Sequence, residues 1–139
     1  MIYRMNILFH HGDVKKFYKT ISSDDIAAFE SGIVHDVYAT FALARDAEWS
    51  GRLFVLEMKE ADEEGIGTQL QVTHVSPAFV GDEVVFESTF VAINEKNEIM
   101  TSFKVFFNNR LIAECIQGQK ILKKEKIDRI FQTLKNPTL

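Results

Sequence analysis

The stretch VYATFALARDAEW, residues Val37–Trp49, indicates a long helix. Apolar and small side chains recur in it at spacings of three and four residues, and turn-forming residues are few. Thr40 lies near its start, and Gly51 interrupts the pattern just after its end. A second helical piece is expected over Leu53–Ala61, followed by an acidic loop at Asp62–Gly65. The middle of the chain is therefore predicted to be a helical block.

The chain before this block starts with a strand. Lys15–Ile21 mixes aromatic and aliphatic side chains with Lys and Thr in a strand-like way. The run Ser22–Asp25 then offers N-cap chemistry, which predicts a short helix over Ile26–Glu30 that ends at Ser31-Gly32.

The chain after the block alternates between apolar and polar residues. From Gly67 onward, Leu70, Val72 and His74 share one side of a predicted strand. An amphipathic helix is expected near the C-terminus, ending before Asn136 and packing back on the domain or on a partner. Three further strands, predicted to form an antiparallel meander, are Glu83–Ile93, Glu98–Asn108 and Leu111–Leu122.

This order predicts an α+β fold, in which one antiparallel sheet wraps around a long helix. All 139 residues are assigned to a single domain, because no repeat or linker divides them. Its core is expected over about residues 17–127, with a short N-terminal extension and the C-terminal helix outside it. Thr101–Phe107 is apolar on both faces, more than one helix can cover, which predicts a homodimer and leaves a higher oligomer open.

Composition excludes several classes of function. Sixteen Lys and Arg against twenty Asp and Glu give a net charge of −4, which argues against nucleic acid as a partner. No apolar run is long enough to cross a bilayer, so a membrane is not an expected partner. The single cysteine, Cys115, excludes an internal disulfide and fits a cytoplasmic location. The four histidines show no metal-ligand spacing, so no metal is expected.

Two residues of the predicted helix could carry chemistry. Thr40 and Glu48 are eight positions apart, which places them two turns apart on roughly one stripe, with the small Ala44 between them. Space for a ligand could remain above Ala44. The alternative is that Thr40 is an N-cap and Glu48 a solvated helix residue, and spacing alone does not decide between the two.

His74 is unusual because it occupies the apolar side of its strand. A buried imidazole needs a hydrogen-bond partner, and a buried carboxylate on the helix would serve. His74 could equally be a satisfied core residue or a catalyst. Cys115, on an alternating strand with no histidine nearby in sequence, is interpreted as a core residue rather than a nucleophile.

Together these residues resemble the hotdog-fold thioesterases similar to fluoroacetyl-CoA thioesterase. The specific part is the Thr40, Glu48, His74 set, with intervals of 8 and 26 residues. The resemblance covers roughly residues 17–127 and implies a hotdog fold, a homodimer, acyl-CoA as substrate and this set as catalytic, with the Gly67 amide near the thioester carbonyl. The motifs that carry it are Val37–Thr40, Glu48, Gly67-Thr68, Val72–His74, Pro77 and Gly81–Val84.

The expected function is hydrolysis of a short or small acyl-CoA thioester to the free acid and CoA. Glu48, expected to be partly buried between helix and sheet, would activate water or attack the thioester itself, and no cofactor is required. The bulky Phe41 and Phe79 are expected near the acyl slot. The alternative is a non-catalytic module that binds acyl-CoA or another small ligand. A hydratase of enoyl thioesters ranks last, because the helix around Asp46 contains no histidine.

Overall fold

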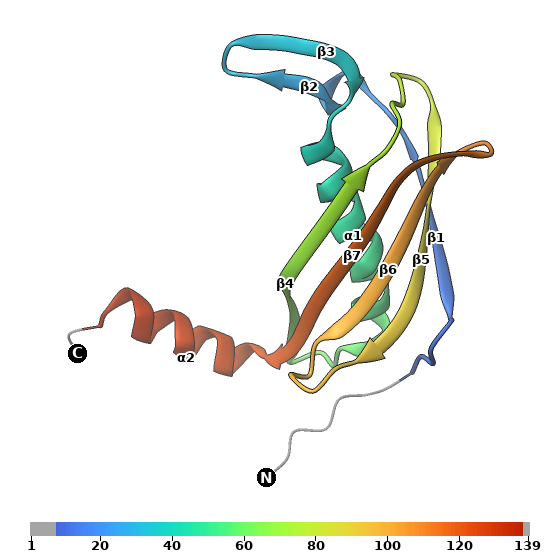
Figure 1. Ribbon diagram of the computed structural model, residues 1–139. Helices are drawn as coiled ribbons and strands as arrows, with labels where there is room; N and C mark the ends of the chain where they lie inside the picture. The colour runs from blue at the N-terminus through green and yellow to red at the C-terminus, as the bar shows by residue number, and fades with distance from the viewer. Residues whose placement is uncertain (1–7, 138–139) are drawn as a thin grey trace.

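The computed structural model describes residues 8–137, which form a five-stranded antiparallel sheet with one long helix lying against it (Figure 1). A two-stranded hairpin and a C-terminal helix extend from this body. No helix of residues 8–137 is long and apolar enough to cross a membrane. The first part of the expected N-terminal extension, residues 1–7, lies outside the described residues.

The sheet has the strand order β1-β5-β6-β7-β4. The consecutive antiparallel pairs β5–β6 and β6–β7 confirm the predicted meander. β1 pairs with β5 and β4 with β7, so the strands before and after the long helix occupy opposite edges of the sheet. The strands are β1 (Val14–Thr20), β4 (Glu63–His74), β5 (Glu83–Ile93), β6 (Ile99–Phe107) and β7 (Arg110–Lys123).

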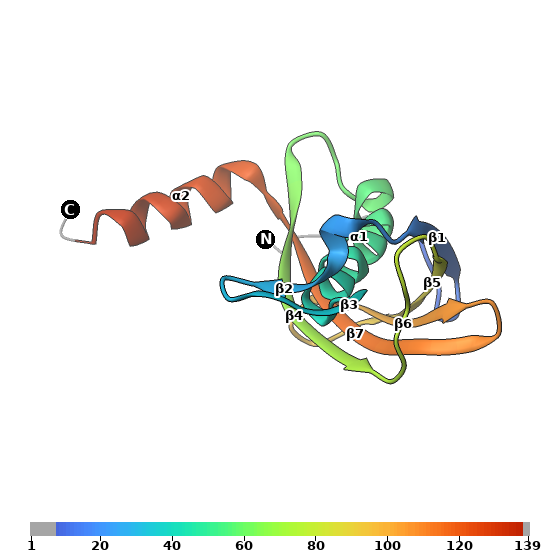
Figure 2. The same ribbon diagram turned by 90° about the horizontal axis from the view of Figure 1, so that it is seen from above.

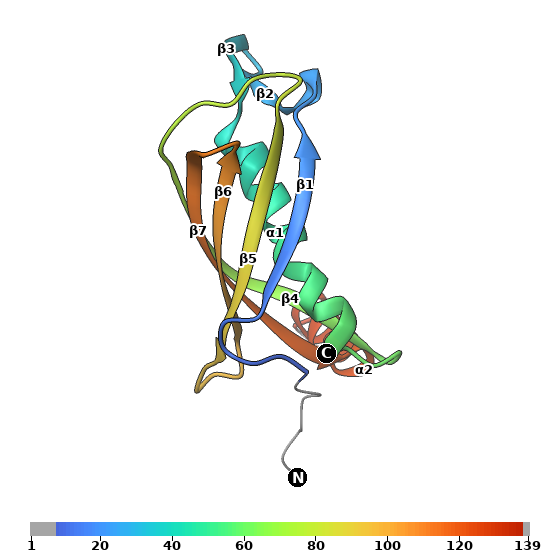
Figure 3. The ribbon, with the colours of Figure 1, turned by 90° about the vertical axis from the view of Figure 1, so that its right-hand side faces the viewer.

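Helix α1 (Thr40–Met58) covers one face of the sheet, as Figures 2 and 3 show from two further directions. Its inner side includes Leu43, Phe54 and Met58, which are fully buried. Leu43 packs in a cluster with Phe86 of β5, whereas Phe54 and Met58 belong to a second cluster near the other end of the helix. Burial of this apolar surface is the main force holding helix and sheet together.

Helix α1 is continuous, so the predicted interruption at Gly51 and the separate piece over Leu53–Ala61 are wrong. Gly51 does not end the helix; it allows the helix to pack closely against the sheet. A Cβ atom on Gly51 would lie 1.7 Å from Oε1 of Gln117 on β7. The missing side chain therefore lets the helix approach the sheet at this point. The helix also begins later than predicted, at Thr40, because Val37 belongs to a preceding strand.

The predicted helix over Ile26–Glu30 is also wrong. Ser22 does act as an N-cap, but it caps only a single 3-10 turn, η1 (Ser23–Asp25). The chain then forms β2 (Ile26–Phe29), which pairs with β3 (Gly32–Tyr38) in a separate hairpin. Gly32 has a φ of 111°, a conformation that suits a tight reversal between two strands.

The expected acidic loop at Asp62–Gly65 is largely part of β4. This strand begins at Glu63, which is paired with Lys123 of β7. The Glu63 side chain is buried because its carboxylate turns back and accepts a hydrogen bond of 2.7 Å from the backbone N–H of Glu60. This local hydrogen bond satisfies the buried carboxylate, so an acidic residue can begin this edge strand.

The predicted C-terminal helix is present as α2 (Lys124–Lys135), which follows β7 without a loop. It does not pack back along its own domain, but projects away from the sheet (Figure 1). Ile127 is its one buried residue, whereas Ile130, Phe131 and Leu134 are exposed. Its direction follows from β7, because the helix begins at Lys124, directly after Lys123, which is the last residue of β7 and is still paired with Glu63 of β4.

Candidate active site

The start of α1 is held by two backbone hydrogen bonds from the residues before Thr40. The N–H of Tyr38 donates to the carbonyl of Ala78, and the N–H of Ala39 donates to that of Asp25, each at 2.8 Å. Ala39 is the N-cap residue, so Thr40 is the first residue of the helix and its side chain is not a cap. The hydroxyl of Thr40 is therefore available for another partner.

That partner is His74, at the end of β4. Thr40 Oγ1 lies 3.0 Å from Nδ1 of His74. The histidine is on the inner side of its strand with Leu70 and Val72, which pack against the core as predicted. Its hydrogen-bond partner is a hydroxyl group, however, and not the carboxylate expected from the sequence. The structure thus joins two of the three predicted catalytic residues directly.

The second ring nitrogen of His74 faces a different environment. Nε2 is buried and has no hydrogen-bond partner among residues 8–137. Burial lowers the pKa of His74 below its ordinary value, and a hydrogen bond with the backbone of Ser76 opposes this effect only in part. The imidazole is therefore neutral at pH 7.

Glu48 lies two turns along α1 from Thr40 and is exposed in the single chain. The expectation that it is partly buried is wrong for one copy, because the strand opposite it carries no side chain at Gly67. A Cβ atom on Gly67 would lie 3.1 Å from Oε1 of Glu48. No side chain of residues 8–137 donates a hydrogen bond to this carboxylate, and no contact joins it directly to His74.

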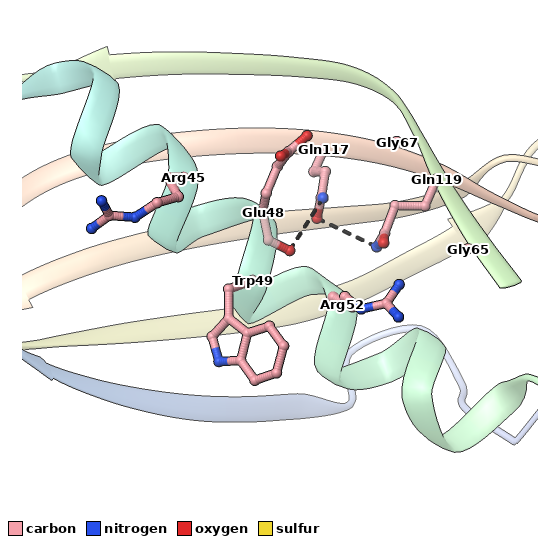
Figure 4. A pocket seen from close by; sticks show the side chains of 8 residues that line it. All are labelled: Arg45, Glu48, Trp49, Arg52, Gly65, Gly67, Gln117 and Gln119. Carbon is pink, nitrogen blue, oxygen red and sulfur yellow. Dashed lines mark hydrogen bonds between the residues drawn. The ribbon is translucent and has the colours of Figure 1, made fainter.

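A pocket of about 300 Å³ opens between α1 and β4 beside Glu48 (Figure 4). The Glu48 side chain points toward β4 from the helix. β4 has a bulge at Thr68, immediately after Gly67, a type of irregularity that often shapes a strand beside a functional site. The pocket is lined by Arg45, Glu48, Trp49, Arg52, Gly65, Gly67, Gln117 and Gln119.

The floor of this pocket contains two buried glutamines from β7 that the sequence analysis did not identify. Gln117 Nε2 donates to the backbone carbonyl of Glu48 at 3.4 Å, and Gln119 Nε2 donates to Gln117 Oε1 at 3.4 Å. These amides hold the helix backbone at the level of Glu48 against the sheet. The sequence did contain a signal for them. Gln117 and Gln119 continue the every-second-residue series of Ala113 and Cys115, so strand periodicity places all four side chains on the core face.

The arginines of the pocket are already paired with other carboxylates. Arg52 Nη2 lies 2.7 Å from Glu64 Oε1, and Arg45 Nη2 lies 2.7 Å from Asp25 Oδ1. In Figure 4 the guanidinium group of Arg45 points away from Glu48. Glu48 therefore has no cationic side chain paired with it among residues 8–137.

Arg45 also belongs to a largely buried charge cluster below the start of α1. It binds Asp46, whose Oδ2 accepts a hydrogen bond of 2.5 Å from the Tyr38 hydroxyl. Lys19 of β1 lies 3.4 Å from Asp25. The cluster ties β1, β3 and α1 together next to Thr40. Sequence patterns did not indicate it because Asp25 lies 20 positions before Arg45, and Lys19 lies farther still.

The two phenylalanines expected at the acyl slot do not line the pocket beside Glu48. Phe41 follows Thr40 and packs edge-on against Phe29 of the hairpin, with ring centroids 5.6 Å apart. Phe79 is exposed in the loop between β4 and β5, next to Ala78, whose carbonyl accepts the Tyr38 N–H. Phe41 is thus next to Thr40 in the chain, whereas Phe79 is linked to this region only through the Ala78–Tyr38 hydrogen bond.

Other candidate groups can be placed as well. Cys115 is buried, and burial raises the pKa of its thiol to about 11, so it is protonated at neutral pH and unsuited to nucleophilic attack. Within residues 8–137, no three His, Cys, Asp or Glu side chains are grouped in a way that could hold a metal ion.

Comparison with solved structures defines the class of fold. A Thermus thermophilus protein described as a thioesterase superfamily member is 28% identical, with a TM-score of 0.86 over 92% of this chain and 94% of that one. A hot-dog-like protein from Thermanaerovibrio acidaminovorans is 18% identical, with a TM-score of 0.80 over 90% and 93% of the two chains. The fluoroacetyl-CoA thioesterase FlK is 14% identical, with a TM-score of 0.80 over 90% and 96%. The architecture is thus that of a hotdog-like thioesterase.

The sequence supports a narrower assignment. Residues 21–125 match the model of the family described as FlK, fluoroacetyl-CoA-specific thioesterase. The chain belongs to this family, which confirms the resemblance drawn from its motifs. No curated protein sequence matches the chain significantly.

Proposed function

We propose that this protein hydrolyses short or small acyl-CoA thioesters to the free acid and CoA. The observation that carries the proposal is the Thr40–His74 hydrogen bond at the N-terminus of α1, with the unpaired carboxylate of Glu48 two turns farther along the same helix. Family membership supports this reaction class. One structure of an FlK variant, which shares this fold, was determined with fluoroacetate and CoA.

Glu48 is the proposed base or nucleophile. As a base, its carboxylate takes a proton from water while the water oxygen bonds to the thioester carbonyl carbon; the C–S bond then breaks and the CoA thiolate receives a proton. As a nucleophile, its oxygen attacks the same carbon to form a mixed anhydride, which water hydrolyses after CoA leaves. Both routes need a carboxylate without a permanent cation beside it, which is the state of Glu48 in the single chain.

Developing negative charge on the thioester oxygen needs hydrogen-bond donors. The first N–H groups of α1 have no partners within the helix, and the positive end of the helix dipole lies there. We propose that Thr40 holds the reacting group at this end and that the Gly67 N–H faces the oxyanion. His74, neutral and hydrogen-bonded to Thr40, orients the hydroxyl group or protonates the leaving group.

Two features support a small acyl group. The pocket beside Glu48 has a volume of about 300 Å³, at the lower end of the range for small-molecule sites. Phe41 follows Thr40 in the chain, and Phe79 follows Ala78, which is hydrogen-bonded to the Tyr38 backbone, so both bulky residues are proposed to restrict a long chain near the Thr40 end of the helix.

The site is proposed to be completed in a homodimer. β4 is an edge strand with no proline and no charged residue from Gly65 to His74, so its free backbone groups are open to pairing. Glu48 and the pocket lie beside this edge, and a second copy would cover them. The single buried cysteine fits a reducing cytoplasmic compartment.

The decisive experiment is a panel of acyl-CoA esters, from acetyl to long-chain, assayed for released thiol. We expect turnover of the short esters above that of the long ones. If thiol were released from every ester no faster than in the uncatalysed background, the proposed thioesterase activity would be refuted. Saturable binding of acyl-CoA under those conditions would then favour the non-catalytic binding module.

A further inference from the structure

Helix α2 lacks the packing that a short helix needs. Twelve residues form barely three turns, and isolated helices of this length are marginal in water. Its exposed apolar side chains, Ile130, Phe131 and Leu134, recur at helical spacing on the side that also carries Ile127. A hollow of about 410 Å³ borders this side and shares Ile130 and Leu134 with it; its other lining residues are Lys126, Arg129 and Thr133. The helix therefore presents an amphipathic face that another surface should cover.

The β2–β3 hairpin is a second exposed apolar element. Phe29, Ile33 and Val34 are all more than half exposed. The hairpin carries Glu30 and Asp36 but no lysine or arginine. Helix α2 has four basic and two acidic side chains, so the two elements have opposite net charge.

The two elements lie at opposite ends of the same edge strand. α2 begins beside the start of β4, where the Lys124 N–H donates to the carbonyl of Asp62. The hairpin leads into Thr40, which is bonded to His74 at the end of β4. In Figures 1 and 2 both elements extend past β4 on the same side of the molecule. They are too far apart along the strand to cover each other within one copy.

A second copy removes this separation. When an edge strand pairs with its own copy about a twofold axis perpendicular to the sheet, the two strands are antiparallel. The start of β4 in one copy then lies beside the end of β4 in the other. We propose that α2 of each protomer packs its apolar face on the β2–β3 hairpin of its partner. Two such contacts, each of which we call the clasp, would hold the dimer together. This inference rests on the homodimer proposed above.

The clasp has a consequence for the candidate active site. Phe29 of the hairpin packs against Phe41, the residue after Thr40. A helix from the partner seated on the hairpin would hold it in place next to the Thr40–His74 pair. Each site would then depend on both copies.

Cross-linking in mixed dimers tests the contact. Unlabelled and ¹⁵N-labelled full-length chains are mixed, allowed to exchange and treated with a zero-length carbodiimide, and cross-linked peptides are identified by mass spectrometry. We expect light–heavy links from Lys126 or Lys135 of one copy to Glu30 or Asp36 of the other. A dimer that yields only links within one copy, or none between these elements, overturns the clasp. A protein that sediments only at 15.9 kDa overturns both the dimer and the clasp.

Matched variants give a second readout. Ile130→Asp on α2 and Ile33→Asp on the hairpin should each raise the dimer dissociation constant by about tenfold or more, whereas Gln132→Asp on the opposite side of α2 should change it little. Because the two apolar residues serve one contact, the double variant should be less impaired than the product of the single effects. Equal effects of Ile130→Asp and Gln132→Asp would contradict the clasp. Absence of thioester hydrolysis with the cross-links present would refute only the proposed reaction.

Discussion

The hydroxyl oxygen of Thr40 lies 3.0 Å from Nδ1 of His74, although 34 residues separate them in the chain. The contact joins the first residue of α1 to the last residue of β4. Backbone bonds to Ala78 and Asp25 hold the residues on one side of it, and burial excludes water from His74 Nε2 on the other. The pair is therefore placed by the fold before any ligand binds.

Removing the Thr40 hydroxyl should impair the reaction more than it impairs the fold. We expect Thr40→Val, which keeps the shape, to lower kcat/KM roughly a hundredfold, the usual loss for one donor to the transition state. Thr40→Ser keeps the hydroxyl and should retain activity within about tenfold. Steady-state kinetics of the two variants provides the measurement. Equal losses would show that the methyl group, and not the hydroxyl, is what matters.

His74 should titrate below pH 6.5. Burial lowers its pKa, so the unfolded chain binds the proton more readily than the native state does. This residue's contribution to stability is then fully present above pH 6.5 and decreases as the pH falls from there toward the lowered pKa. NMR titration of the His74 ring protons reports the pKa directly, with His74→Gln to assign the signal. A pKa at or above 6.5 would contradict the neutral imidazole assumed for the site.

Glu48→Gln is the clearest test of the chemistry, because it preserves shape and removes the base. Turnover should fall by roughly two to four orders of magnitude, the span typical of a general base. Substrate binding and the far-UV circular dichroism spectrum should be retained, since the side chain is exposed and makes no hydrogen bond within residues 8–137. Glu95→Gln, an exposed glutamate in the β5–β6 turn, is the matched control. If Glu48→Gln were fully active, Glu48 would be neither the base nor the nucleophile, and Thr40 would become the candidate nucleophile.

Asp25 should stabilise the native state most strongly above pH 4. Its burial alone would raise its pKa, but hydrogen bonds from the Ser22 backbone and from Arg45 outweigh this and lower the pKa from 3.8 to about 2. The stabilisation is therefore present above pH 3.8 and lost as the pH falls through about 2. Asp25→Asn should lower the free energy of unfolding at pH 7 by about 2 to 3 kcal/mol.

Urea unfolding at several pH values checks this expectation. The difference between wild type and Asp25→Asn should shrink as the pH falls from 5 to about 2. Asp128→Asn, on the exposed surface of α2, should show no comparable difference. A difference for Asp25→Asn that does not vary with pH would argue against the ion pair.

Gly51→Ala should destabilise the protein even though alanine favours helices. Its Cβ would meet Gln117 Oε1 at 1.7 Å, so the buried glutamine must move or the helix must retreat. We expect a loss of about 1 to 3 kcal/mol in the free energy of unfolding, the range for overpacking a core. Gly51→Ala combined with Gln117→Ala should recover part of the loss. A stabilised single variant would show that the helix can shift at no cost.

Much of the fold could be predicted because it depends on local pattern. Alternation located β5, β6 and β7 within one or two residues, and the run Ser22–Asp25 does contain a cap, although it caps a 3-10 turn and not the expected helix. The hairpin could not be predicted, since Ile26–Phe29 forms a strand only because β3 follows to pair with it. The continuity of α1 through Gly51 likewise depends on Gln117, which is 66 positions away in the chain.

For the candidate site, the sequence by itself determined which residue types stand at which intervals along the helix and the strand. Helical and strand periodicity place side chains on definite faces, which made Thr40, Glu48 and His74 candidates. The resemblance to the thioesterase family, and not the spacing alone, selected them as the catalytic set. Only the tertiary structure decided that His74 is bonded to Thr40 and that Glu48 stands apart against Gly67. The distance between a helix and a strand is set by the packing of residues remote in sequence, and no local pattern encodes it.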